Sequence, residues 1–259
     1  MQPVGGLWTY KYMHQAHGIA PYSCTDHHLP HLLVRTFLIF PARTCLSASS
    51  DPTRSDGGSL LSSMADKWKH TALLVIDMQK DFVEEEDSPM RVNGGEAIVP
   101  NVIEAVEVAR RRGILVIWVV REHDPLGRDV ELFRRHWYSP GKPGPTSKGS
   151  RGAELVDGLV IREGDYKLVK TRFSAFFATH LHSLLQGAGI DTLVITGVQT
   201  PNCIRQTVFD AVALDYKSVT VLVDATAAAS LEVHLANVFD MKNVGVATPT
   251  LEQWSKSDA

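Results

Sequence analysis

The sequence predicts a single α/β domain with three layers, in which helices cover both faces of a six-stranded, parallel, Rossmann-like sheet. Two observations predict it. Several apolar runs show no alternation of polar residues, which is typical of strands buried on both faces. Segments with helical spacing separate these runs, and strands that alternate with helices form right-handed βαβ units. No internal repeat and no second folded domain is evident.

The elements follow in order from these patterns. Residues 71–76 are a continuous apolar run, and residues 98–112 place apolar side chains at helical spacing before Gly113. The same reasoning gives strands at 71–76, 114–120, 166–169, 192–196, 219–223 and 244–247. It gives further helices at 180–186, 202–216 and 231–241.

Composition narrows the function classes. The chain has 259 residues, of which 44% are hydrophobic and 21% charged, as in ordinary globular proteins. A net charge of −3 gives no electrostatic reason to expect nucleic acid or an anionic membrane as a partner. No apolar run approaches the roughly 18 residues that a membrane span needs. Three scattered cysteines suggest no disulfide framework, so a reducing compartment is expected.

Residues 1–63 differ from the rest, and we expect the folded domain to occupy 64–259. The first segment shows no sustained period and ends in a linker rich in Ser, Gly and Asp. It is either a disordered extension, with Met64 as the working start, or a transit peptide that is poor in acids. The first alternative predicts a cytoplasmic protein, and the second a plastid or mitochondrial one.

Three reactive side chains fall at carboxyl ends of predicted strands. Asp77 follows the first strand, Lys170 the third and Cys203 the fourth. Open parallel sheets bind their ligands at this edge, so a central first strand would bring the three together. A carboxylate beside a thiol takes its proton, and a nearby lysine stabilises the resulting anions. The pattern therefore predicts a cysteine hydrolase with an aspartate as its acid and base.

Cys203 lies where a strand passes into a helix. Unpaired N–H groups and the helix dipole at that place favour a thiolate, and they also suit an oxyanion. We therefore expect Cys203 to favour its thiolate form. The alternative is that Cys203 is simply a small buried hydrophobic residue, as most single cysteines are.

Three motifs connect these residues to a known family. They are VIDMQKDF at 75–82, KTRFSAF at 170–176 and GVQTPNC at 197–203. Their order and spacing resemble those of the isochorismatase-like cysteine hydrolases, over roughly residues 69–254. The block at 121–136 looks most like the plant, nicotinamidase-related members.

The resemblance implies a site and a mode of action. By position, it implies a catalytic triad of Asp77, Lys170 and Cys203. It also implies a cis peptide near Val198–Gln199, with backbone groups of Val198, Gln199 and Cys203 around the oxyanion. A small-molecule substrate and a homo-oligomer are further implications, and no organic or redox cofactor is implied.

A divalent metal is the one cofactor that the resemblance raises. Nicotinamidases of this superfamily bind a metal ion through an Asp-x-His pair and a later histidine. This chain has Glu122-His123-Asp124 and then His136, so its aspartate follows the histidine instead of preceding it by two. We therefore expect no resident metal, with zinc as the alternative. Nicotinamidase activity is correspondingly not expected.

Four residues are predicted to line the substrate pocket. Arg121 and Glu122 follow the second strand and would face the crevice, unless they form a plain surface ion pair. Phe82 and Phe173 would supply apolar walls. Arg134, Arg135 and His136 are candidate carboxylate anchors, the alternative being a solvated loop.

The function that these patterns favour is cleavage of a C–N bond in a small amide or ureido compound, through a thioester. One alternative is an isochorismatase-type hydrolase that cleaves a vinyl ether, which needs an acid but no thiol. Another is a catalytically silent binding protein on the same scaffold. Nothing in the sequence selects the physiological substrate.

Overall fold

A computed structural model describes residues 68–142 and 144–257 of the chain. The predicted extension at 1–63 lies outside the described residues, so both alternatives for it remain predictions. Within the described part, no helix is long and apolar enough to cross a membrane.

Five parallel strands form one sheet in the order β3-β2-β1-β4-β5. They are β1 (Thr71–Ile76), β2 (Leu115–Arg121), β3 (Tyr166–Lys170), β4 (Thr192–Val198) and β5 (Ser218–Ala227). All six residues of β1 are buried, because this strand lies at the centre of the sheet and both of its faces are covered. The predicted α/β class with a parallel sheet is therefore confirmed.

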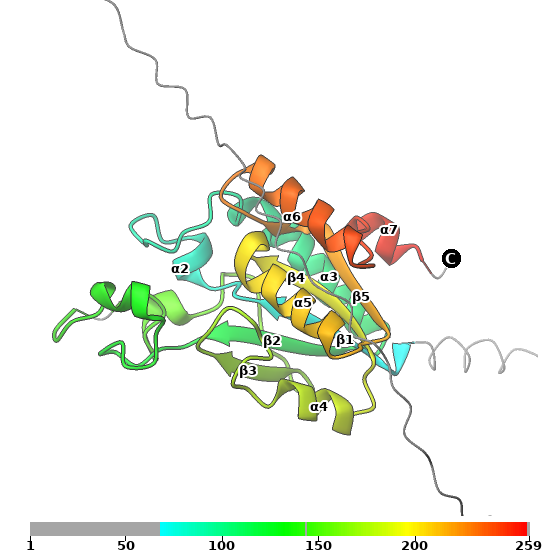
Figure 1. Ribbon diagram of the computed structural model, residues 1–259, viewed down its shortest axis with the longest axis horizontal. Coiled ribbons are helices and arrows are strands. Elements are labelled where there is room, and N and C mark those ends of the chain that lie inside the picture. The colour runs from blue at the N-terminus through cyan, green and yellow to red at the C-terminus, as the bar shows by residue number, and fades with distance from the viewer. Residues whose placement is uncertain (1–67, 143, 258–259) are drawn as a thin grey trace, which may run out of the picture. The chain divides into compact units, whose positions relative to one another are not determined.

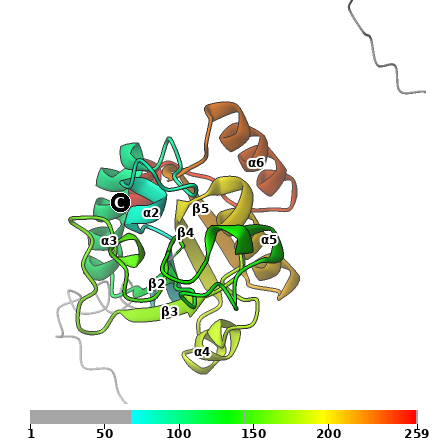
Figure 2. The ribbon, with the colours of Figure 1, turned by 90° about the vertical axis from the view of Figure 1, so that its left-hand side faces the viewer.

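Helices cover both faces of the sheet (Figures 1 and 2). On one face, α3 (Val99–Arg111) and α7 (Leu251–Ser255) pack against the odd-numbered side chains of β1, such as Leu73. On the other face, α4 (Leu181–Gly187), α5 (Arg205–Ala213) and α6 (Leu231–Asn243) pack against the even-numbered ones, such as Leu74. Alternate side chains of a strand point to opposite faces, so a fully apolar strand supplies both cores.

The remaining elements are short and lie near the carboxyl edge of the sheet or before the longer helices. They are α2 (Lys80–Val83), the 3₁₀ turns η1 (Glu96–Ile98), η2 (Leu132–Trp137) and η3 (Arg151–Ala153), and the π-helical turn η4 (Thr200–Ile204).

The prediction of a sixth strand at 244–247 is wrong. In the described residues this segment makes only one parallel bridge, between Ala247 and Thr220 of β5. The helix α6 runs on to Asn243, and Gly245 then adopts a left-handed conformation with φ of 86°. Beyond the bridge, the carbonyl of Pro249 still accepts from the N–H of Val223 on β5 at 3.0 Å. Pro249 has no N–H to donate in return, so no second bridge forms. The sheet therefore ends at β5.

Candidate active site

Asp77, Lys170 and Cys203 lie together at the carboxyl edge of the sheet. Asp77 follows β1, Lys170 ends β3 and Cys203 lies in η4, just after β4. The Lys170 ammonium nitrogen is 2.7 Å from Asp77 Oδ2 and 3.4 Å from Cys203 Sγ. The side chains of Asp77 and Lys170 are fully buried, and Cys203 is 3% exposed. The structure thus brings the three sequence-predicted residues into contact, with the lysine bridging the other two.

The backbone at Asp77 is held in an unusual conformation. Asp77 has a φ of 52°, in the left-handed region that non-glycine residues rarely adopt. Its N–H donates a hydrogen bond of 2.8 Å to the carbonyl of Val119 on β2. This turn directs the carboxylate towards Lys170 at the end of β3.

Gln79 is a buried positioning residue that the sequence reasoning missed. Its amide nitrogen donates to the carbonyl of Arg121 at 2.7 Å and to that of Ala153 at 2.8 Å. Its amide oxygen accepts from the N–H of Arg121 at 2.7 Å. Gln79 therefore fastens the end of β2 to the turn that carries Asp77. Its place two residues after Asp77, in the first motif, was the available signal.

Gly197 allows the ends of β1 and β4 to approach each other. It has a φ of 109°, and a Cβ at this position would lie 2.0 Å from the carbonyl oxygen of Ile76. Only glycine fits both the conformation and the contact. Ile76 and Gly197 are paired in the sheet, so the turns to Asp77 and to Cys203 begin side by side.

Cys203 lies in a π-helical turn and not in the first turn of an α-helix. The N–H of Ile204 donates to the carbonyl of Gln199, five residues earlier, at 3.3 Å. The helix α5 begins at Arg205 and ends at Ala213, so the predicted helix at 202–216 is shorter at both ends. Turns of this kind occur frequently at functional sites. The Val198–Gln199 peptide is cis, at the position that the resemblance implied.

The charge state of Cys203 differs from the expectation. Burial raises the pKa of the thiol above its ordinary value, and the negative charge of Asp77 raises it further. Lys170 and Arg121 oppose this rise without cancelling it. The expected thiolate is therefore not the resting form, because the neighbouring carboxylate and the loss of solvent outweigh the cations. Asp77 Oδ1 is buried and has no hydrogen-bond partner among the described residues, so this oxygen is open to accept a hydrogen bond.

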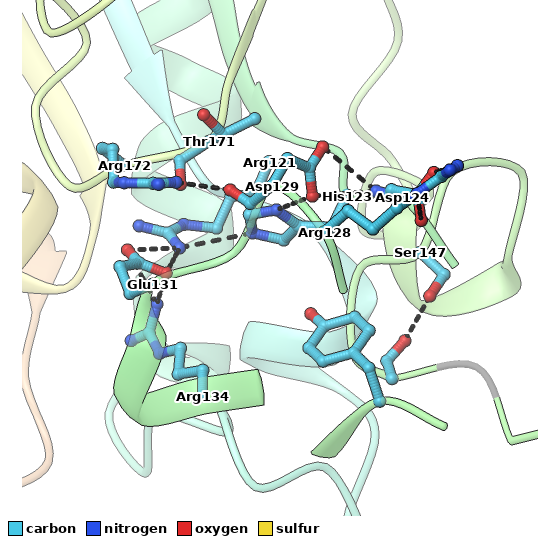
Figure 3. Close-up of polar contacts among 12 residues, drawn as sticks. Arg121, His123, Asp124, Arg128, Asp129, Glu131, Arg134, Ser147, Thr171 and Arg172 are labelled. Carbon is cyan, nitrogen blue, oxygen red and sulfur yellow. Dashed lines mark hydrogen bonds and ion pairs between the residues drawn. The ribbon is translucent and has the colours of Figure 1, made fainter. Parts of the chain in front are cut away.

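A second polar cluster surrounds Arg121, which is paired in the sheet with Lys170 of the triad. Figure 3 shows the polar contacts of this cluster. Arg121 Nη1 donates to both oxygens of Glu131, at 2.9 and 3.0 Å, and Arg134 Nη1 lies 3.4 Å from each. The Phe173 ring centroid is 5.3 Å from the guanidinium carbon of Arg121 and 5.1 Å from that of Arg134. Two guanidinium groups thus share one carboxylate over one aromatic ring.

The structure places the other predicted pocket residues differently. Phe82 is 2% exposed and packs in the core on the α3 face, because α2 turns its apolar side inward. Glu122 pairs with Lys167 of β3. Successive strand residues face opposite ways, so the direction of Arg121 towards the triad sends Glu122 to the other face. Arg135 and His136 are exposed.

The residues near His123 do not fit a divalent metal. His123 Nε2 lies 3.4 Å from Arg121 Nη1, and its Nδ1 lies 3.2 Å from Asp129 Oδ1. Arg121 stands two residues before the histidine, where the resemblance implies an aspartate. A guanidinium there contributes positive charge and no ligand atom. In the part of the chain that is described, no three His, Cys, Asp or Glu residues are grouped so as to hold a metal ion.

Comparison with known proteins agrees with this geometry. Residues 71–253, which are most of the described chain, match the isochorismatase domain. The chain belongs to the isochorismatase family.

Known proteins with different names resemble this chain. A probable inactive nicotinamidase of Arabidopsis thaliana is 70% identical over 194 residues, which are 74% of this chain and 98% of that protein. A ureidoacrylate amidohydrolase of an Enterobacter species is 34% identical over 174 residues, covering 61% and 75%. The solved structure of an isochorismatase family protein from Desulfovibrio vulgaris is 42% identical, with a TM-score of 0.69, over 71% of this chain and 96% of that one.

Proposed function

We propose that this isochorismatase-family protein hydrolyses a C–N bond of a small amide or ureido compound through a thioester on Cys203. One observation carries the proposal: the Lys170 ammonium lies within hydrogen-bond distance of both the Asp77 carboxylate and the Cys203 sulfur. A nucleophile, a base and a cation that stabilises their charges are the parts that acyl transfer by a thiol requires.

The steps follow from the protonation states. Asp77 Oδ1 takes the thiol proton, and the sulfur then attacks the carbonyl carbon to form a C–S bond. The C–N bond breaks as Asp77 returns the proton to the leaving nitrogen, which departs as an amine or ammonia. Asp77 next takes a proton from water, whose oxygen attacks the thioester and releases the acid. The thiol regains the proton, so the cycle closes without a redox step.

The raised pKa of the thiol fits this sequence of steps. A thiol that stays protonated at rest needs its base in contact, and the carboxylate is held in place by Lys170. We propose that the N–H of Cys203 and a backbone N–H near Gln199 receive the oxyanion, as the resemblance implies. We also propose that the reaction needs no metal ion, because a guanidinium faces His123.

The rival function is a silent binding protein on the same fold. The name of the Arabidopsis relative, a probable inactive nicotinamidase, favours testing it. Absence of nicotinamidase activity and absence of all hydrolysis are different claims, however. The contact between Arg121 and His123 supports the absence of nicotinamidase activity, because it does not fit the metal that nicotinamidases bind. The triad, in contrast, argues against the absence of all hydrolysis.

The test is turnover of a panel of small amides and ureido acids by the purified full chain, with and without EDTA. We expect hydrolysis of at least one compound, unchanged by EDTA. It should be lost in Cys203→Ala and in Lys170→Met, while Lys167→Met, which changes an exposed lysine of the same strand, should retain it. Hydrolysis that survives in Cys203→Ala would refute the thioester route.

A further inference from the structure

The polar cluster beside the triad has more buried positive charge than negative charge. Arg121, Arg134 and Lys170 have side chains that are 0%, 8% and 0% exposed. Among the described residues that contact them, two carboxylates share this interior: Asp77, which is fully buried, and Glu131, which is 10% exposed. Asp129 is 40% exposed and is engaged by His123 and the N–H of Asp124. The buried groups therefore lack one negative charge.

The same two arginines have unused donors. A guanidinium offers five N–H groups in a fixed plane, and buried donors normally have acceptors. Arg121 Nε and Nη2 and Arg134 Nε are buried and have no hydrogen-bond partner within the described residues. An unsatisfied buried donor on a charged group is costly, so such groups in a folded protein indicate a missing acceptor. The missing acceptor must be anionic, because it must also supply the missing charge.

Arg121, which carries two of the unused donors, ends its strand at the same edge of the sheet as the triad. Arg121 and Lys170 are paired in register at the ends of β2 and β3, so their side chains leave the same face of the sheet. The negative charge of Asp77, and that of Cys203 when its thiol is deprotonated, act on both Arg121 and Arg134, so both guanidinium groups lie within electrostatic reach of the triad. The ring of Phe173 lies against both and limits where their planes can turn.

We propose that the substrate is a small amide that also carries a carboxylate, and that Arg121 and Arg134 together bind this carboxylate. The inference rests on the proposed function, which accounts for the reaction at the amide group of this substrate. A planar guanidinium fork matches the two oxygens of a carboxylate, and Arg suits this role better than Lys because it binds both oxygens at once. Glu131 holds the two arginines in position through their Nη1 groups, and leaves Nε and Nη2 of Arg121 and Nε of Arg134 for the ligand. Neutral ring amides lack the group that this site recognises.

The first experiment measures anion binding without chemistry. Malonate, succinate and glutarate are titrated into the full chain by calorimetry, alongside the neutral diamide of each acid. We expect a dicarboxylate of one length to bind, and its diamide to bind at least about tenfold more weakly. Arg134→Gln should weaken dicarboxylate binding by about tenfold or more, and Arg134→Lys should weaken it less. The matched control is Arg135→Gln, the exposed neighbour on η2, which should bind as wild type does.

The second experiment measures turnover of the monoamides of these acids and of their methyl esters. We expect kcat/KM for an acid monoamide to exceed that of its ester, and we expect Arg134→Gln to lower kcat/KM more for the acid than for the ester, so that the preference is lost. Hydrolysis of ester and acid at equal rates would overturn the anion site while leaving the proposed function intact. Binding that depends on the arginines, without turnover of any amide, would contradict the proposed function while leaving the anion site intact. Equal binding of dicarboxylates and diamides, or no binding of either, would refute the inference.

Discussion

At the scale of single residues, the thiol of Cys203 has the most informative environment. Its pKa is raised by burial and by Asp77, so the fraction of thiolate at a given pH is smaller than for a free cysteine. We predict that iodoacetamide labels Cys203 slowly at pH 7, and that the rate rises about tenfold per pH unit and levels off only above the ordinary thiol value of 9.0. Asp77→Asn removes a charge that raises the pKa, so this variant should label faster at pH 8.

Peptide-resolved mass spectrometry distinguishes Cys203 from Cys24 and Cys45. The control is Asp210→Asn, which changes a carboxylate outside the triad and should label as wild type does. Rapid labelling of the wild type at pH 7, or slower labelling of Asp77→Asn, would contradict the electrostatic account. Slow labelling at neutral pH alone does not indicate a silent protein, because a resting thiol in contact with its base behaves in the same way.

Gln79 supports a second prediction at this scale. Gln79→Leu leaves the N–H and carbonyl of Arg121 and the carbonyl of Ala153 without their partner. Each unsatisfied buried group costs about 1–3 kcal/mol, so we expect the free energy of unfolding to fall by roughly 3 kcal/mol or more. Urea denaturation measures the change. Gln186→Leu, at an exposed position of α4, should change stability by less than about 0.5 kcal/mol, and similar losses in both variants would refute the positioning role.

The sequence allowed the triad to be placed but not the second cluster. Asp77, Lys170 and Cys203 each follow an apolar run, and parallel strands put such positions at one edge. Glu131 and Arg134, in contrast, belong to a long irregular segment between β2 and β3 that shows no periodicity. Their contact with Arg121 depends on the path of a 3₁₀ turn, which no local pattern specifies.

At the scale of elements, the pairing of β1 with β4 sets the geometry of the site. We predict that Gly197→Ala is strongly destabilising, because its Cβ would meet the carbonyl oxygen of Ile76 at 2.0 Å and its φ is 109°. A loss of at least about 2 kcal/mol in the free energy of unfolding is expected, as for other changes at positive φ with a backbone clash. Any folded protein should also lose turnover, since both catalytic turns start here.

Gly187→Ala is the matched control for this prediction. Gly187 ends α4, and a Cβ there would meet nothing within 4 Å. Alanine favours a helix over glycine by about 1 kcal/mol, so this variant should be as stable as wild type or more stable. An equal loss of stability in the two variants, measured by thermal unfolding, would show that the close approach of β4 to β1 does not determine the stability of the protein.

Sequence patterns predict the existence of helices and strands better than they predict where these elements begin and end. The apolar run at 244–247 looks like a strand, but a strand also needs neighbours that can complete its ladder. Pro249 and the left-handed Gly245 limit the pairing to a single bridge. In the same way, the apolar spacing of residues 202–216 predicted one helix, whereas the first turn is π-helical and carries the cysteine.

At the scale of the whole molecule, the sequence predicted the class, the parallel sheet and the single edge that carries the site. The central place of β1 could only be assumed, because strand order depends on tertiary packing, and the structure supports that assumption. The homo-oligomer and the cellular compartment remain predictions. Both depend on surfaces or residues beyond those that determine the site.

The measurement that tests the central claim most directly is the intact mass of the full chain during turnover of a slowly hydrolysed amide. We predict a transient mass increase equal to the acyl group, located on the peptide that contains Cys203, and absent from Cys203→Ala. The adduct should decay at the rate at which the acid product appears. Steady turnover without any adduct, and at the same rate in Cys203→Ala, would contradict the account.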